Sequence, residues 1–146
     1  MPERKSRPYH GDGFTVDLPE DWRDTTIHTL EGPAKDGIQH NILISAERDL
    51  PFETAVQYAE SQISSLESEL KGYRLLDKGP VTLDNGLPGH RIIFSWQPSE
   101  NLLIYQHQMY VLVDRTGYKL TATFSKTTYK TLGPAVQRIL MSFRPE

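Results

Sequence analysis

The chain has 146 residues, with 16 basic and 19 acidic side chains and no cysteine. This length fits a single domain, and the lack of cysteine excludes a disulfide scaffold, a thiolate nucleophile, a thiolate zinc site and a lipid-modified N-terminal cysteine. The apolar runs are far shorter than the roughly 20 residues that a membrane-spanning helix needs. The N-terminal segment also lacks the apolar stretch of a signal peptide. The sequence therefore indicates a cytoplasmic protein without direct membrane insertion.

Charge is distributed unevenly along the chain. Residues 115–146 hold six basic side chains and one acidic side chain, which gives 6 − 1 = +5, whereas the whole chain carries −3. Nucleic-acid-binding domains concentrate Lys and Arg on one surface and have a basic isoelectric point, but the isoelectric point here is about 5.9. The charge pattern thus favours a solvated C-terminal face over nucleic-acid binding.

The N-terminal third reads as an arm followed by strands. Residues 1–12 contain Pro2, Pro8 and Gly11 without apolar periodicity, which predicts a flexible arm ahead of a single domain over residues 13–146. Period-2 alternation then predicts strands over residues 14–18, 22–30 and 38–47, with a loop over 31–37.

An amphipathic helix is the clearest element of the sequence. Apolar residues recur at helical spacing over residues 52–71, and Gly72 provides a C-terminal stop. We expect one face of this helix to pack on a sheet. That face holds Phe52, Val56, Ala59, Ile63, Leu66 and Leu70.

The second half consists mainly of hairpins and a closing helix. One strand is predicted over the apolar runs at residues 73–76 and 81–83, and three more over 89–97, 102–113 and 118–124, joined in part by the tight-turn sequences at 84–86 and 114–117. A final helix is predicted from about residue 126 to 143. The order βββαββββα predicts an α+β fold of the sandwich type, an antiparallel sheet with both helices on one face.

No catalytic or metal chemistry stands out. The five histidines are scattered without ligand spacing, and no nucleophile motif, carboxylate pair or phosphate-binding glycine loop is present. The sequence accordingly predicts no cofactor, no metal site and no enzymatic activity.

The strand over residues 102–113 is rich in apolar residues on both faces. If the even-numbered residues of strands 89–97 and 118–124 face the helices, this strand has a second face that must be covered by something else. A loop, the N-terminal hairpin or a second copy of the chain could cover it. Alternatively, that face is a groove for an apolar partner segment, in which Gln106, Gln108 and threonines supply hydrogen bonds.

Several motifs resemble one family. The run from Phe14 to Trp22, the helix after Pro51, Gln108-x-Tyr110-x-Leu112 and Thr121-x-Thr123 are similar to the DcrB-like family, which has the PsbP fold. Within it, the chain most resembles the Eag proteins, cytoplasmic chaperones of type VI secretion effectors. DcrB itself resembles an exported lipoprotein, whereas this chain lacks both the signal and the lipid-bearing cysteine.

The resemblance implies a homodimer whose sheet faces shield the hydrophobic N-terminal transmembrane segments of a secreted effector. Nine positions are the partner-binding candidates that it implies: Ile27, Thr29, Leu43, Ile93, Ser95, Ile104, Gln106, Gln108 and Thr121. Within this set, Ile93 and Ser95 are expected on the same open face as the others. The main alternative is a PsbP-like scaffold or adaptor that binds a folded protein partner.

Overall fold

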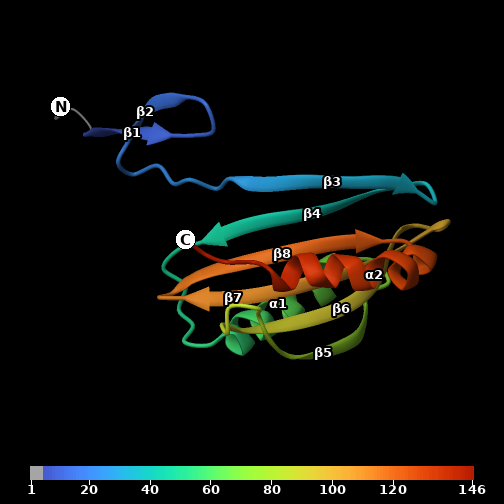
Figure 1. Ribbon diagram of the computed structural model, residues 1–146. Coiled ribbons are helices and arrows are strands. Elements are labelled where there is room, and N and C mark those ends of the chain that lie inside the picture. Colours follow the sequence, from blue (N-terminus) through green and yellow to red (C-terminus); the bar gives the residue numbers. More distant parts are fainter. Residues whose placement is uncertain (1–4) are drawn as a thin grey trace.

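The computed structural model describes residues 5–146 (Figure 1). Within this range the chain forms two sheets and two helices. The elements, in chain order, are β1 (Ser6–His10), β2 (Thr15–Pro19), β3 (Ile27–Lys35), β4 (Ile38–Glu47), α1 (Ala55–Glu69), β5 (Arg74–Thr82), β6 (Pro88–Ser99), β7 (Leu102–Val113), β8 (Thr116–Phe124) and α2 (Lys126–Met141). The predicted α+β class with an antiparallel sheet is confirmed.

The main sheet has the strand order β3-β4-β8-β7-β6-β5, and all its neighbouring strands are antiparallel. Two of its connections are tight turns with consecutive positive φ angles. These turns lie at Asp36 (54°) and Gly37 (75°) between β3 and β4, and at Asp114 (48°) and Arg115 (67°) between β7 and β8. Positive φ at both central residues matches the right-handed twist of the flanking strands, so the predicted turn after residue 113 is confirmed.

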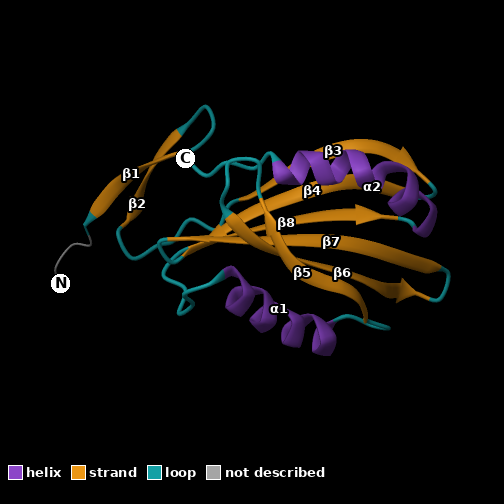
Figure 2. Ribbon diagram, turned by 60° about the horizontal axis from the view of Figure 1, so that its bottom comes forward, coloured by secondary structure: helices purple, strands orange, loops and turns teal. Residues whose placement is uncertain are grey.

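The two helices lie on opposite faces of this sheet, with α1 on one side and α2 on the other (Figure 2). Tyr110 of β7 contacts Tyr58 of α1, with 5.1 Å between the ring centroids. The adjacent residue Met109 instead belongs to the cluster that contains Leu140 of α2. Neighbouring residues of a strand point to opposite faces, so the prediction that both helices share one face is wrong.

The strand register explains this error. Ile92 of β6 pairs with Gln108 of β7, which in turn pairs with Thr121 of β8. Paired residues lie on the same face of a sheet, so even-numbered residues of β6 share a face with odd-numbered residues of β8. The prediction that even-numbered residues of both strands face the same side is therefore wrong.

Helix α1 covers the middle of its face through Tyr58 and Ala59, which are buried against Ile92 and Phe94. Its first turn is capped by the Thr54 side chain, which accepts a hydrogen bond from the Gln57 backbone. Val56 is 43% exposed, so its predicted place in the core is wrong. The inward face of the helix is therefore centred on Tyr58 and Ala59.

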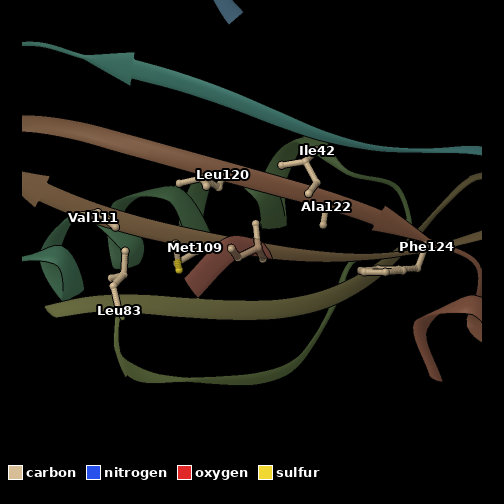
Figure 3. Close-up of a cluster of buried hydrophobic side chains, with 8 residues drawn as sticks. Ile42, Leu83, Met109, Val111, Leu120, Ala122 and Phe124 are labelled. Carbon is tan, nitrogen blue, oxygen red and sulfur yellow. The ribbon is translucent and has the colours of Figure 1, made fainter. Parts of the chain in front are cut away.

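Helix α2 covers the other face and completes the second core cluster. Figure 3 shows buried residues of this cluster, which come from β4, β7 and β8 and, for Leu83, from the loop after β5. The Nε2 atom of His40 lies 2.7 Å from the Oγ1 atom of Thr128, which joins β4 to the first turn of α2. A reciprocal capping box between Ser125 and Thr128 fixes the same turn.

The N-terminal segment forms a hairpin instead of an arm. Strand β1 pairs with β2 from Ser6 opposite Pro19 to His10 opposite Thr15, as a sheet separate from the main one. The prediction of a flexible arm over residues 1–12 is therefore wrong for residues 6–10, and residues 1–4 lie outside the described part. The predicted strand from residue 22 begins instead at Ile27 and continues through the expected loop to Lys35.

The two buried tyrosines between α1 and the sheet give a first testable prediction. Burial raises the pKa of the Tyr58 hydroxyl above its ordinary value, and this hydroxyl has no hydrogen-bond partner among residues 5–146. The Tyr110 hydroxyl instead donates to Oε1 of Gln108. Removing an unpaired buried hydroxyl relieves a desolvation cost, whereas removing a paired one leaves its partner unsatisfied.

We therefore expect Tyr58→Phe to maintain or raise the free energy of unfolding in urea. The matched variant Tyr110→Phe should lower it by about 1–3 kcal/mol. Equal destabilisation by both variants would contradict this assignment of the two hydroxyls.

A buried histidine on the α2 face gives a pH prediction. Burial, together with the nearby Arg91, lowers the pKa of His107 to about 4, while Asp77 acts weakly in the opposite direction. An unfolded chain has a His pKa near 6.5, so between pH 6.5 and 4 the unfolded state binds more protons than the folded state. His107 therefore lowers the free energy of unfolding as the pH falls through this window, by roughly 3 kcal/mol in total.

Urea denaturation at several pH values checks this expectation. The slope of stability against pH between 4 and 6.5 should be smaller in His107→Leu than in the wild type. An unchanged slope would show that other groups carry the acid sensitivity.

Candidate functional site

One part of the α1 face carries no helix. Helix α1 packs on β6 and β7, and on the same face β3, β4 and β8 continue beyond it. We call this surface the open face. Its residues, placed by the strand register, are Ile27, Thr29, Glu31, Asn41, Leu43, Ser45, Lys119, Thr121 and Thr123.

Apolar side chains on the open face are concentrated toward β3. Ile27 is 58% exposed, and Leu43 on the neighbouring strand β4 is half-buried. Every residue of β3 is exposed. Near α1, by contrast, Thr121 is buried. The open face therefore runs from a closed inner side next to the helix to an exposed outer strand.

A row of hydrogen-bonded side chains on the α1 face reaches the open face at Thr123. The Nε1 atom of Trp96 donates to Oε1 of Gln106 at 3.0 Å, and Nε2 of Gln106 donates to Oγ1 of Thr123 at 3.1 Å. The row thus joins β6, β7 and β8. A primary amide has two N–H groups and two lone pairs on its oxygen, so these contacts leave Gln106 with one further donor and one further acceptor.

The second glutamine of β7 has a different role. Gln108 is buried, and its Oε1 accepts the hydrogen bond from the Tyr110 hydroxyl. This amide therefore belongs to the polar interior under α1. Of the two glutamines proposed from the sequence, Gln106 is the half-buried one at the surface.

The structure divides the nine sequence-predicted residues between the two faces of the sheet. Seven of them lie on the α1 face: Ile27, Thr29, Leu43, Ile104, Gln106, Gln108 and Thr121. Ile93 and Ser95 lie on the α2 face because they pair with His107 and Tyr105 of β7. Ile93 is only 5% exposed, so the expectation that Ile93 and Ser95 share the open face is wrong.

The nine candidate positions leave out three polar residues of this region. Trp96 and Thr123 form the two ends of the hydrogen-bonded row, and Asn41 of β4 lies on the same face. Within the described part of the chain, the buried side-chain oxygen of Asn41 has no hydrogen-bond partner. Alternation alone placed Trp96 with the core, and its link to Gln106 depends on the register between β6 and β7.

The open face carries few charged side chains. The strand register places one cation, Lys119, and one anion, Glu31, on it. Across residues 5–146, no three histidine or acidic side chains come together as metal ligands, and neither helix is long and apolar enough to cross a membrane. The arrangement offers apolar area and amide hydrogen bonds.

Comparisons with known proteins agree on the fold. A Pseudomonas aeruginosa protein of unknown function, PA94, described as a putative regulator, is 18% identical with a TM-score of 0.77, and the alignment covers 97% of each chain. CyanoP, the PsbP of the cyanobacterium Synechocystis, is 10% identical with a TM-score of 0.57 and coverage of 100% of this chain and 95% of its own. No curated protein matches the sequence.

A third solved structure broadens the set. LpqN of Mycobacterium tuberculosis, described as involved in cell envelope biogenesis, is 18% identical with a TM-score of 0.58, over 92% of this chain and 87% of its own. At such identities the likeness establishes the PsbP-like fold. The DcrB family model matches residues 14–142, nearly the whole chain, and the protein therefore belongs to the DcrB family.

Proposed function

We propose that this protein is a non-catalytic cytoplasmic chaperone that shields the hydrophobic N-terminal transmembrane segment of a type VI secretion effector before export. The observation that carries the proposal is the open face, a half-sheet that neither helix of the described residues covers. Membership of the DcrB family and the resemblance to Eag chaperones support it. The client segment lies on β3, β4 and β8 beside α1.

The apolar client segment needs a surface that covers it in water. A membrane-spanning helix in water exposes about 20 apolar residues and aggregates unless another surface covers them. Ile27 and Leu43 provide apolar area for such a helix on the outer part of the open face. Because a helix is about 10–12 Å wide and strands lie about 4.8 Å apart, one helix fits across three strands.

The hydrogen-bonded row supplies the polar part of recognition. A client helix has unpaired backbone groups at its ends and at any kink, and these groups are costly to bury without partners. Gln106 retains one donor and one acceptor after its contacts with Trp96 and Thr123. The amide is held in place by those two contacts, so it offers a fixed partner for such backbone groups.

Two exposed residues of β3 provide a matched test. Ile27 is 58% exposed on the open face, whereas Leu30 is 54% exposed on the opposite face of the same strand. Burying an isoleucine contributes about 1.5–3 kcal/mol, and a charge in its place adds a desolvation cost. We expect Ile27→Asp to weaken client binding by at least roughly 10-fold and Leu30→Asp to leave it near wild type.

The measurement is co-purification of the N-terminal segment of a co-expressed effector with each variant, followed by titration of the purified complex. Thermal unfolding of both variants establishes that each is folded. Equal recovery of the segment with wild type and Ile27→Asp would rule out the open face as its binding surface. Recovery of a folded effector domain without the apolar segment would instead support the scaffold function.

A further inference from the structure

The two helices carry charges of opposite sign. Helix α1 has exposed acidic side chains and no basic residue, whereas α2 has exposed basic side chains and no acidic residue. The acidic ones are Glu60, Glu67 and Glu69, and the basic ones are Lys126, Lys130 and Arg138. Because the helices lie on opposite faces of the sheet (Figure 2), the basic helix is on the face that the proposed function does not use.

One side of α2 exposes an apolar residue over the outer strands. Thr128 points toward β4, since its Oγ1 atom lies 2.7 Å from Nε2 of His40. Residues two and three turns further along a helix lie on the same side, which places Ala135 and Ile139 above β4 as well. Ile139 is 52% exposed, so this side of the helix is not covered by the rest of the described chain.

The sheet beside this side of α2 is also apolar. Leu30 of β3 pairs with Ile42 of β4, and Ile42 belongs to the core cluster that contains Leu140 of α2. Leu30 therefore lies on the α2 face, where it is 54% exposed. Ile44 of β4 lies on the same face and is half-buried. We call Leu30, Ile44 and Ile139 the α2-side surface.

Unpaired positive charge flanks the α2-side surface. Lys35 of β3 pairs with Ile38 of β4, which places it on the α2 face at the end of the strand. Arg138 directly precedes Ile139 on the helix. Neither side chain forms an ion pair within residues 5–146. A partner with carboxylates at these two places would therefore complement the charge of this surface.

The acidic groups close to the α2-side surface lie at its ends. Asp36, next to Lys35, accepts a hydrogen bond from Oγ of Ser125 at 2.9 Å. At the opposite end, a hollow of about 250 Å³ below the C-terminal residues is lined by charges of both signs, namely Asp24, Glu146, Arg48 and Arg144. The charges around that hollow balance one another, so the positive surplus remains at Lys35 and Arg138.

We propose that an acidic amphipathic helix of a partner protein packs beside α2, over β3 and β4. Its apolar side rests on Leu30, Ile44 and Ile139, and its carboxylates face Lys35 and Arg138. This mode of recognition places one apolar helix face on an exposed apolar surface. The site lies on the opposite side of the sheet from the open face, so both surfaces can be occupied at once.

The dimensions of the surface suit one helix. Helix α2 lies over β7 and β8, so β4 and β3 extend about 10 Å beyond it at a strand spacing of about 4.8 Å. Packed helices have axes about 8–10 Å apart, which puts a second helix directly above these two strands. The nine residues of β3 span about 30 Å, the length of a helix of about 20 residues.

A synthetic helical peptide of about 20 residues is the probe. Its leucines follow at helical spacing along one side, and glutamates occupy the other sides. A scrambled peptide of the same composition lacks the apolar stripe and is the matched control. In fluorescence anisotropy, we expect the protein to bind the amphipathic peptide at least roughly 10-fold more tightly than the scrambled one.

Two matched pairs of variants locate the peptide on the protein. Leu30→Asp should weaken binding at least roughly 10-fold, whereas Ile27→Asp, on the opposite face of the same strand, should leave it near wild type. Arg138→Glu should weaken binding about 5-fold. Lys130→Glu makes the same change of charge on the other side of α2 and should weaken binding by less than about 2-fold.

Thermal unfolding establishes that each variant is folded, and Leu30→Ala should show a smaller loss in the same direction. Equal binding of the scrambled peptide, or equal losses in Arg138→Glu and Lys130→Glu, would overturn the proposal. Binding to phosphatidylserine vesicles without binding to the peptide would also overturn it, in favour of a membrane surface. The effector segment is titrated separately. Failure to bind it refutes only the proposed function, and failure to bind the peptide refutes only this inference.

Discussion

The central strand β7 must bury apolar side chains on both of its faces, and the rest of the fold follows from that requirement. Tyr110 points to one side of the sheet, and Met109 and Val111 point to the other. All three are almost completely buried. A single layer of helices covers only one face of a sheet, so the strand needs a helix on each side. Helix α1 provides one layer and α2 the other.

Because each face of the sheet has one helix, neither face of the six strands is fully covered. Helix α1 lies over β6 and β7, and α2 lies over β7 and β8. Strand β3 is therefore exposed along its whole length, and β4 is partly exposed. The open face is thus the direct result of distributing two helices over two faces. A fold with both helices on one face would have left the other face entirely uncovered and would have placed a binding surface there.

The roles of the two glutamines of β7 also depend on where α1 packs. Gln106 and Gln108 both lie on the α1 face of β7, two residues apart. Gln108 is close enough to the buried tyrosines under α1 to be used in the interior. Gln106, nearer the end of the strand, is half-buried and joins Trp96 to Thr123. Position along one strand therefore separates an amide that stabilises the core from an amide that keeps one donor and one acceptor at the surface.

The sequence by itself determined most of the elements, the antiparallel α+β class and the family. Helical spacing after Pro51, alternation in residues 102–113 and the tight-turn sequences are local signals, and each corresponds to an element of the structure. The two-sided apolar character of β7 also indicated a surface that needs a cover. Seven of the nine candidate residues lie together on the α1 face, and those of β3, β4 and β7 follow the regular alternation of these strands.

Tertiary structure alone decided which faces of different strands coincide. The pairing register determines which residues of neighbouring strands lie on the same face. A register shift of one residue moves every side chain of a strand to the other face. No local pattern states that Ile92 lies opposite Gln108, so Ile93 and Ser95 were assigned to the wrong side. The hairpin of β1 and β2 was missed for a related reason. Its five-residue strand β1 contains Pro8 and three polar or charged residues, Ser6, Arg7 and His10, and it is defined as a strand only by its pairing with β2.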